Sequence, residues 1–80
     1  MNVSPSTFKK IANYNALKLL SYLTDSCLND TFVFNRYSAH VIELSYFLTY
    51  KQVKTSLNYL VEIGVLTKLK RGSYKLTEEN

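Results

Sequence analysis

The chain of 80 residues contains few of the residues on which several protein classes depend. A single cysteine, Cys27, excludes a disulfide within the chain. With only one histidine, His40, it also excludes a closed zinc site built from cysteines and histidines. Two glycines and one proline leave little room for long loops. No apolar run approaches the roughly 18 residues of a membrane helix, and no signal-peptide pattern opens the chain.

These absences predict a soluble protein of the cell interior, in the cytoplasm, the nucleoid or a host cell, and not a membrane protein. The sequence also contains no glycine-rich phosphate loop, no HExxH metal motif and no serine-histidine-aspartate set. Asp25, Asp30, His40 and Cys27 are too few and too generic for an active site. We therefore expect no enzyme, no cofactor, no bound metal and no small-molecule ligand. Cys27 is expected to be a small, buried or half-buried hydrophobic residue.

The composition fits one small domain spanning residues 1–80. Hydrophobic residues make up 46 % of the chain, which is enough for a core and argues against disorder. A domain of this length buries only about 60–65 % of the surface of its unfolded chain, so its stability is marginal unless it packs well or dimerises.

Positive charge is concentrated in the C-terminal half of the chain. The formal net charge is +4. Residues 49–76 carry six Lys and Arg against one acid, a net charge of +5, whereas residues 1–48 carry +1 and residues 78–80 carry −2. A cationic excess confined to one segment is the electrostatic footprint expected of a protein that binds a polyanion.

Residues 49–63 have the pattern of an amphipathic helix. Thr49 is a good N-cap, because its hydroxyl can accept a hydrogen bond from the first turn. Gly64 is suited to ending the helix, since glycine adopts the left-handed conformation without strain. Apolar residues recur along one helical stripe, at Val53, Leu57, Leu60 and Val61. The opposite face, with Lys54 on its flank, carries polar side chains that can reach base edges: Lys51, Gln52, Thr55, Asn58 and Tyr59.

Three short runs of branched and aromatic residues predict a small antiparallel sheet. Residues 65–70 and 73–77 flank the pair Arg71 and Gly72, which favours a β-hairpin with a two-residue turn. Residues 31–34 are too few for a helix and are predicted to form a third strand beside the hairpin. The hairpin adds four cations to the polar helix: Lys68, Lys70, Arg71 and Lys75.

The first part of the chain predicts one further helix with a weak point. Ser4 and Pro5 favour a helix start, and residues 5–25 are mostly of helical pattern. Asparagine favours caps and turns, so the helix could start afresh at Asn15. Residues 1–14 would then be a short N-terminal arm rather than a helix extension, ahead of a core helix at about 16–25.

A second helix is predicted directly before the polar one. Ser38 can cap a helix running from Ala39 to about Phe47. Because Thr49 already caps the next helix, the connection has only one to three residues. Two helices joined so tightly must turn sharply, which is typical of a helix-turn-helix arrangement. Residues 78–80 are expected to be a frayed polar end.

This order of elements resembles the winged helix-turn-helix family, including MarR- and ArsR-like regulators and small archaeal, viral and plasmid regulators. Residues 49–77 match best, residues 15–48 more loosely and residues 1–14 not at all. The resemblance implies an α+β fold, a three-helix winged helix-turn-helix with a small antiparallel sheet. The chain departs from the family at Phe47, which stands near a position that is often glycine. The family often has a Leu-Ala pair in its second helix. In this chain the pair corresponds to Ile42-Glu43 if the turn has its normal length, or to Leu44-Ser45 if the turn is two residues shorter.

The resemblance implies that helix 49–63 enters the major groove of double-stranded DNA. Gln52 would pair with adenine and Lys51 with guanine. The candidate contacts in the helix are Thr49, Tyr50, Lys51, Gln52, Lys54, Thr55, Asn58 and Tyr59. The wing, residues 65–77, is short, which favours contacts to phosphate over contacts to bases. Its candidate contacts are Lys68, Lys70, Arg71, Ser73 and Lys75.

The expected function is therefore sequence-specific DNA binding by a transcription regulator. A homodimer on a pseudo-palindrome would multiply the few base contacts of one helix, with the dimer contact in residues 5–23. Two alternatives stay open. The same faces could dock a protein, for example an acidic one. RNA or single-stranded DNA could instead stack on Tyr50, Tyr59 and Tyr74.

Overall fold

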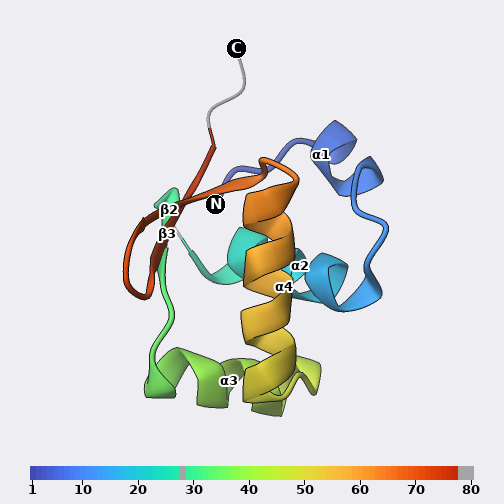
Figure 1. The fold of residues 1–80 in the computed structure, drawn as a ribbon. Helices are drawn as coiled ribbons and strands as arrows, with labels where there is room; N and C mark the ends of the chain where they lie inside the picture. Colours follow the sequence, from blue (N-terminus) through green and yellow to red (C-terminus); the bar gives the residue numbers. More distant parts are fainter. Residues whose placement is uncertain (28, 78–80) are drawn as a thin grey trace.

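The computed structural model describes residues 1–27 and 29–77, and the tail predicted to fray, residues 78–80, lies outside the described residues. The described chain forms four helices and a three-stranded antiparallel sheet (Figure 1). Their bounds are α1 Pro5–Lys9, α2 Tyr14–Ser26, β1 Thr31–Val33, α3 Arg36–Tyr46, α4 Tyr50–Glu62, β2 Leu66–Lys70 and β3 Ser73–Leu76. This α+β architecture confirms the predicted fold class and is compatible with a winged-helix arrangement.

The weak point of the first helix is a true break between α1 and α2. Pro5 opens α1 at its first position, as predicted. The helix starts afresh at Tyr14 rather than Asn15, because the side chain of Asn13 accepts a hydrogen bond from the Ala16 N–H at 3.1 Å. Phe8 and Ile11 pack against the core of the same chain. The segment before α2 therefore covers the domain's own core.

The start of α3 differs from the prediction that Ser38 is its N-cap. Asn35 is the cap, and its side chain accepts from the Ser38 N–H at 2.9 Å. The Ser38 hydroxyl in turn accepts from the Asn35 N–H at 2.9 Å. This reciprocal pair is a capping box, in which Ser38 is the third helical residue. The prediction was wrong by three residues because both members of the box are good cap residues.

The turn between α3 and α4 consists of residues 47–49, which confirms the predicted tight connection. Phe47 takes a left-handed conformation, with φ 57°, which favours glycine and is uncommon for a bulky residue. Ile42 is fully buried whereas Leu44 is 65 % exposed. Of the two candidate pairs, Ile42-Glu43 and Leu44-Ser45, only the first places its apolar side chain in the core. Thr49 caps α4 as predicted.

Helix α4 ends at the predicted glycine. Gly64 has φ +83°, and its N–H donates to the Val61 carbonyl at 3.1 Å. The Val65 N–H donates to the Leu60 carbonyl at 2.9 Å. These two bonds form a Schellman motif, which satisfies the last carbonyls of the helix and directs the chain into β2.

Strand β3 is the centre of the sheet, whose order is β1-β3-β2. Both pairings are antiparallel, and Tyr74 lies opposite Phe32 on one side and Lys68 on the other. The register of the hairpin shifts between Lys68 and Lys70, so β2 bulges near its tip. The predicted third strand and the two-residue turn of the hairpin are confirmed.

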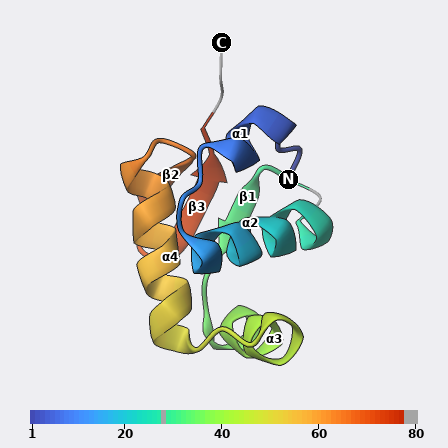
Figure 2. The same ribbon diagram turned by 90° about the vertical axis from the view of Figure 1, so that its right-hand side faces the viewer.

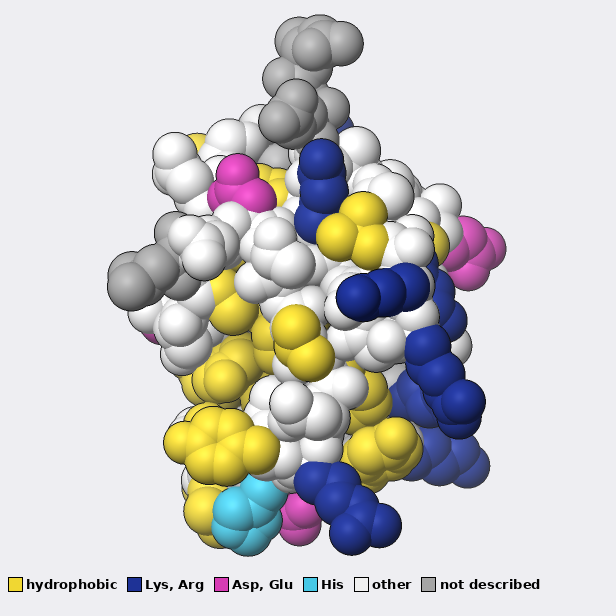
Figure 3. All heavy atoms as spheres, turned by 90° about the vertical axis from the view of Figure 1, so that its left-hand side faces the viewer, with side chains coloured by type: hydrophobic (Ala, Val, Ile, Leu, Met, Phe, Trp, Pro, Cys, Tyr) yellow, Lys and Arg dark blue, Asp and Glu magenta, His cyan; other side chains and the backbone are white. Residues whose placement is uncertain are grey.

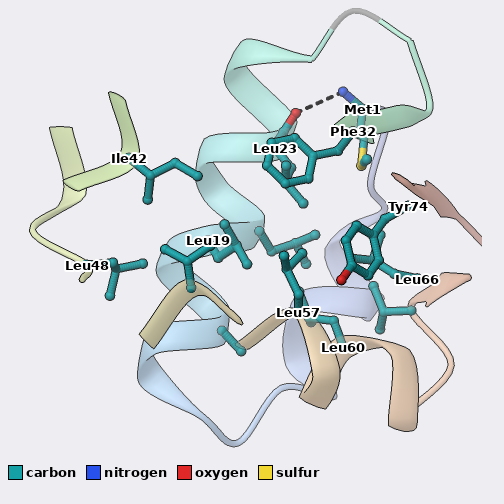
Figure 4. Packing of buried hydrophobic residues seen from close by; sticks show 14 residues of the cluster. Met1, Leu19, Leu23, Phe32, Ile42, Leu48, Leu57, Leu60, Leu66 and Tyr74 are labelled. Carbon is teal, nitrogen blue, oxygen red and sulfur yellow. Dashed lines mark hydrogen bonds between the residues drawn. The ribbon is translucent and has the colours of Figure 1, made fainter. Parts of the chain in front are cut away.

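Helix α2 lies in the middle of the core and sets the orientation of α4. Figure 2 shows α1 at one end of the domain and α3 at the other, with α2 and α4 between them. In Figure 4, side chains from all layers meet around α2, namely Leu19, Leu23, Phe32, Ile42, Leu48, Leu57, Leu60, Leu66 and Tyr74. The Met1 amino group closes this region by donating to the Leu23 carbonyl at 3.0 Å and to the Cys27 carbonyl.

We expect Gly72→Ala to destabilise the domain more than Gly64→Ala. Both residues have positive φ, +78° and +83°, so each loses about 1–2 kcal/mol when a Cβ is added. A Cβ at Gly72 would also meet the Phe34 carbonyl oxygen at 3.1 Å, whereas nothing lies within 4 Å at Gly64. Free energies of unfolding in urea measure the difference. Equal losses would contradict the close approach of the hairpin turn to Phe34.

Candidate nucleic-acid interface

The polar face of α4 is uncovered. Val53, Leu57 and Leu60 have no exposed surface, because α2 and α3 pack against that side of the helix. The opposite side carries the exposed residues Lys51, Gln52, Lys54, Thr55 and Asn58. One helix therefore presents donors and acceptors to solvent while its apolar stripe fixes its orientation.

Cationic side chains continue from this helix onto the hairpin. Lys68, Lys70 and Arg71 are exposed on the edge strand β2 and in the turn that follows it. Figure 3 shows Lys and Arg side chains gathered along one edge of the molecule, at the right of the view. Within α4 and the hairpin the single acid is Glu62, at the far end of the helix. The field along this edge is therefore positive.

Two of the wing residues predicted to contact phosphate, Ser73 and Lys75, are less exposed to solvent than the others. Ser73 is only 9 % exposed, because it lies in the central strand opposite Val33. Its hydroxyl is thus not presented to a phosphate as predicted. Lys75 is half-buried in the same strand, opposite Thr31 and Thr67. The accessible cations of the wing are those of β2 and the turn.

The two tyrosines of α4 have different surroundings. Tyr50 is 55 % exposed, and its ring centroid lies 5.0 Å from that of Phe34. Tyr59 is half-buried, and its hydroxyl accepts from the Ala12 N–H at 3.1 Å. Tyr59 therefore ties the α1–α2 connection to α4, whereas Tyr50 keeps a surface for contacts outside the chain.

The side-chain oxygen of Gln52 takes part in the capping box at the start of α4. The Thr49 N–H donates to Gln52 Oε1 at 2.9 Å, and the Gln52 N–H donates to the Thr49 hydroxyl at 3.2 Å. A glutamine that pairs with adenine through both amide atoms must use Oε1 as the acceptor. The oxygen of a side-chain amide has a second lone pair, so the cap fixes the orientation of the Gln52 amide and leaves one acceptor position for a base.

Sequence reasoning missed a hollow beside the polar face. Its volume is about 170 Å³, and it is lined by Lys51, Gln52, Thr55 and Ser56 of α4 and by Asn13 and Asn15 at the start of α2. The break before α2 brings these asparagines beside the helix. The Asn-Tyr-Asn triplet was visible in the sequence as a turn signal, but its position against α4 depends on long-range packing.

Cys27 and His40 lie away from this surface. Burial raises the pKa of the Cys27 thiol, and the nearby terminal ammonium acts weakly in the opposite direction. A thiol with a raised pKa is mostly un-ionised at neutral pH, which suits a half-buried packing residue. His40 is exposed on α3. In residues 1–27 and 29–77 no group of three or more His, Cys, Asp or Glu is placed to hold a metal ion.

Comparisons of the chain with protein-family models, with curated proteins and with solved structures give no match. Over the described part of the chain, no helix combines the length and apolarity needed to cross a bilayer.

Proposed function

We propose that this domain binds double-stranded DNA and regulates transcription, with α4 in the major groove and the hairpin on the phosphate backbone. The observation that carries the proposal is the uncovered polar face of α4, which continues into the exposed cations of β2 and its turn. An α-helix fits the major groove, where base edges present donors and acceptors. Lys and Arg beside it neutralise phosphates and release counterions.

The position of each residue on α4 and the hairpin determines whether it contacts bases or the phosphate backbone. Lys51 and Thr55 lie near the start of the helix, where recognition helices contact base edges. Gln52 contributes through its amide NH₂ group and the second lone pair of Oε1, while the first lone pair accepts from the Thr49 N–H. Lys54 and Asn58 serve the flanks of the groove. The phosphate contacts come from Lys68, Lys70 and Arg71.

The burial of the tyrosines favours duplex over single-stranded nucleic acid. Stacking of successive bases requires several exposed aromatic rings along one groove. Tyr74 is 4 % exposed, and Tyr59 is half-buried against the core, so neither ring is openly presented for stacking. Only Tyr50 of the three candidates is exposed. One ring beside a polar helix suits contact with a sugar or a thymine methyl group in a duplex.

Selection from random duplex DNA, followed by substitution, tests the proposal. Thr55→Ala is expected to weaken the selected site by about 1–3 kcal/mol and to leave random duplex nearly unaffected, because Thr55 contacts bases. Thr31→Ala is the matched control, since Thr31 is also an exposed threonine but lies on β1. Equal losses on the selected and the random duplex would remove Thr55 from base recognition.

A further inference from the structure

The outer face of α3 carries an apolar stripe that faces solvent, with exposed His40 beside it. Tyr37 is 78 % exposed and Leu44 is 65 % exposed, with half-buried Val41 between them. Their spacing of four and three residues places them on one stripe of the helix. The opposite side of α3 already fills the core through Ser38, Ala39 and Ile42. Helix α3 thus has two apolar faces, and only one of them is covered.

Two exposed aromatic rings enlarge the hydrophobic surface of this region. An aromatic side chain carries roughly 150–250 Å² of surface, and Tyr37 retains most of it. Phe47, 82 % exposed in the turn directly after α3, adds a second ring at the end of the helix. Hydrophobic surface of this kind on a soluble domain commonly marks an interaction site. Figure 3 shows hydrophobic side chains clustered at the end of the molecule where α3 lies.

Charged residues beside the stripe indicate which kind of partner would pack on it. Arg36 and Glu43 are both exposed on α3 and are seven residues apart, so they share one flank of the helix. Neither forms an ion pair with any residue of the described chain. In an antiparallel pair of identical helices centred near His40, Arg36 of each copy faces Glu43 of the other. The same arrangement places Tyr37 against Leu44 of the other copy and Val41 near the two-fold axis.

We propose that α3 is a self-association surface, on which a second copy of this chain packs antiparallel through Tyr37, Val41 and Leu44, with reciprocal Arg36–Glu43 pairs. The inference does not depend on DNA binding, because it uses α3 and leaves the polar face of α4 free. It replaces the expected dimer contact in residues 5–23, where Phe8 and Ile11 already pack on their own core. One helix buries less than the roughly 800 Å² per partner of a standard interface, so the dimer is weak and concentration-dependent.

Reciprocal charge reversal tests this pairing. Arg36→Glu leaves two acids on the flank and Glu43→Arg leaves two bases, so each variant alone repels its own copies. An equimolar mixture restores both opposite-charge pairs. Sedimentation equilibrium should show at least tenfold weaker self-association for each single variant, and association at least as strong as wild type for the mixture. Circular dichroism checks that both variants fold.

A matched pair of tyrosines tests the apolar stripe. Tyr37→Ser should weaken self-association at least tenfold, whereas Tyr14→Ser should leave it unchanged. Tyr14 is 73 % exposed on α2 and belongs to the segment 5–23. A wild-type chain that stays monomeric at millimolar concentration would overturn the proposal. So would loss of association with Tyr14→Ser, or a mixture of charge variants that fails to associate. None of these outcomes depends on whether DNA is bound.

Discussion

Replacing Lys68, Lys70 and Arg71 together by alanine should weaken binding to any duplex roughly 100- to 1,000-fold at about 0.1 M salt. Each phosphate contact contributes about 0.9 to the slope of log K against log salt, so losing three should reduce the slope by roughly three units. The residues are exposed and make no core contact, which should leave folding intact. Fluorescence anisotropy with a labelled random duplex over a salt series measures both quantities.

Lys9→Ala provides the control for net charge in this experiment. Lys9 is exposed on α1, at the end of the domain opposite the start of α4 (Figures 1 and 2). Its loss should change the slope by much less than any single wing substitution. A triple variant that keeps the wild-type salt slope would show that the hairpin does not contact phosphates.

Leu57→Ala should remove about 3–5 kcal/mol of unfolding free energy. Leu57 has no exposed surface and lies between α4 and α2 in the core. An 80-residue domain has a total stability of about 4–12 kcal/mol, so this one substitution would remove a large share of it. Thr55→Ala, two residues earlier on the exposed face, should change stability by only about 0.5 kcal/mol. Urea denaturation measures both variants.

The contrast between these two neighbours also tests the orientation of α4. If Leu57→Ala proved as mild as Thr55→Ala, the apolar stripe would not face the core. The polar residues would then not face solvent together, and the proposed interface would lose its basis.

The elements of the C-terminal half could be predicted because their signals are local. A cap at Thr49, a glycine stop at Gly64 and a turn at Arg71-Gly72 each involve groups only a few residues apart in the chain. The structure confirms all three. The spacing of the apolar residues likewise predicts which face of α4 is buried.

The details that the sequence does not reveal depend on choices between neighbouring residues or on contacts between distant segments. Asn35 and Ser38 are both good caps, and only the complete hydrogen-bonded box shows which one opens α3. Ser73 is a polar residue in a short strand, and its burial follows from its pairing with β1. Tyr59 is directed to Ala12 by the packing of α1 and α2, 47 residues away in sequence. None of these contacts has a local signature.

The exposed side of α3 was also missed, for a related reason. Its residues Tyr37 and Leu44 fit a helical stripe equally well whether that stripe faces the core or solvent. Ile42 offers a competing apolar face on the same helix. Only the structure shows which face is covered, and hence that one apolar face is left over.

The most direct test of the account is the affinity of the wild-type domain and two charge variants for a random duplex at low salt. Lys51 lies on the polar face of α4 and Lys9 lies on α1. The substitutions Lys51→Glu and Lys9→Glu change the net charge by the same amount, so they differ only in position. We expect salt-dependent duplex binding that exceeds binding to the matching single strand, with a large loss of affinity for Lys51→Glu and a small one for Lys9→Glu. Absence of duplex binding by the wild-type domain, or equal losses with the two variants, would contradict the proposed DNA interface.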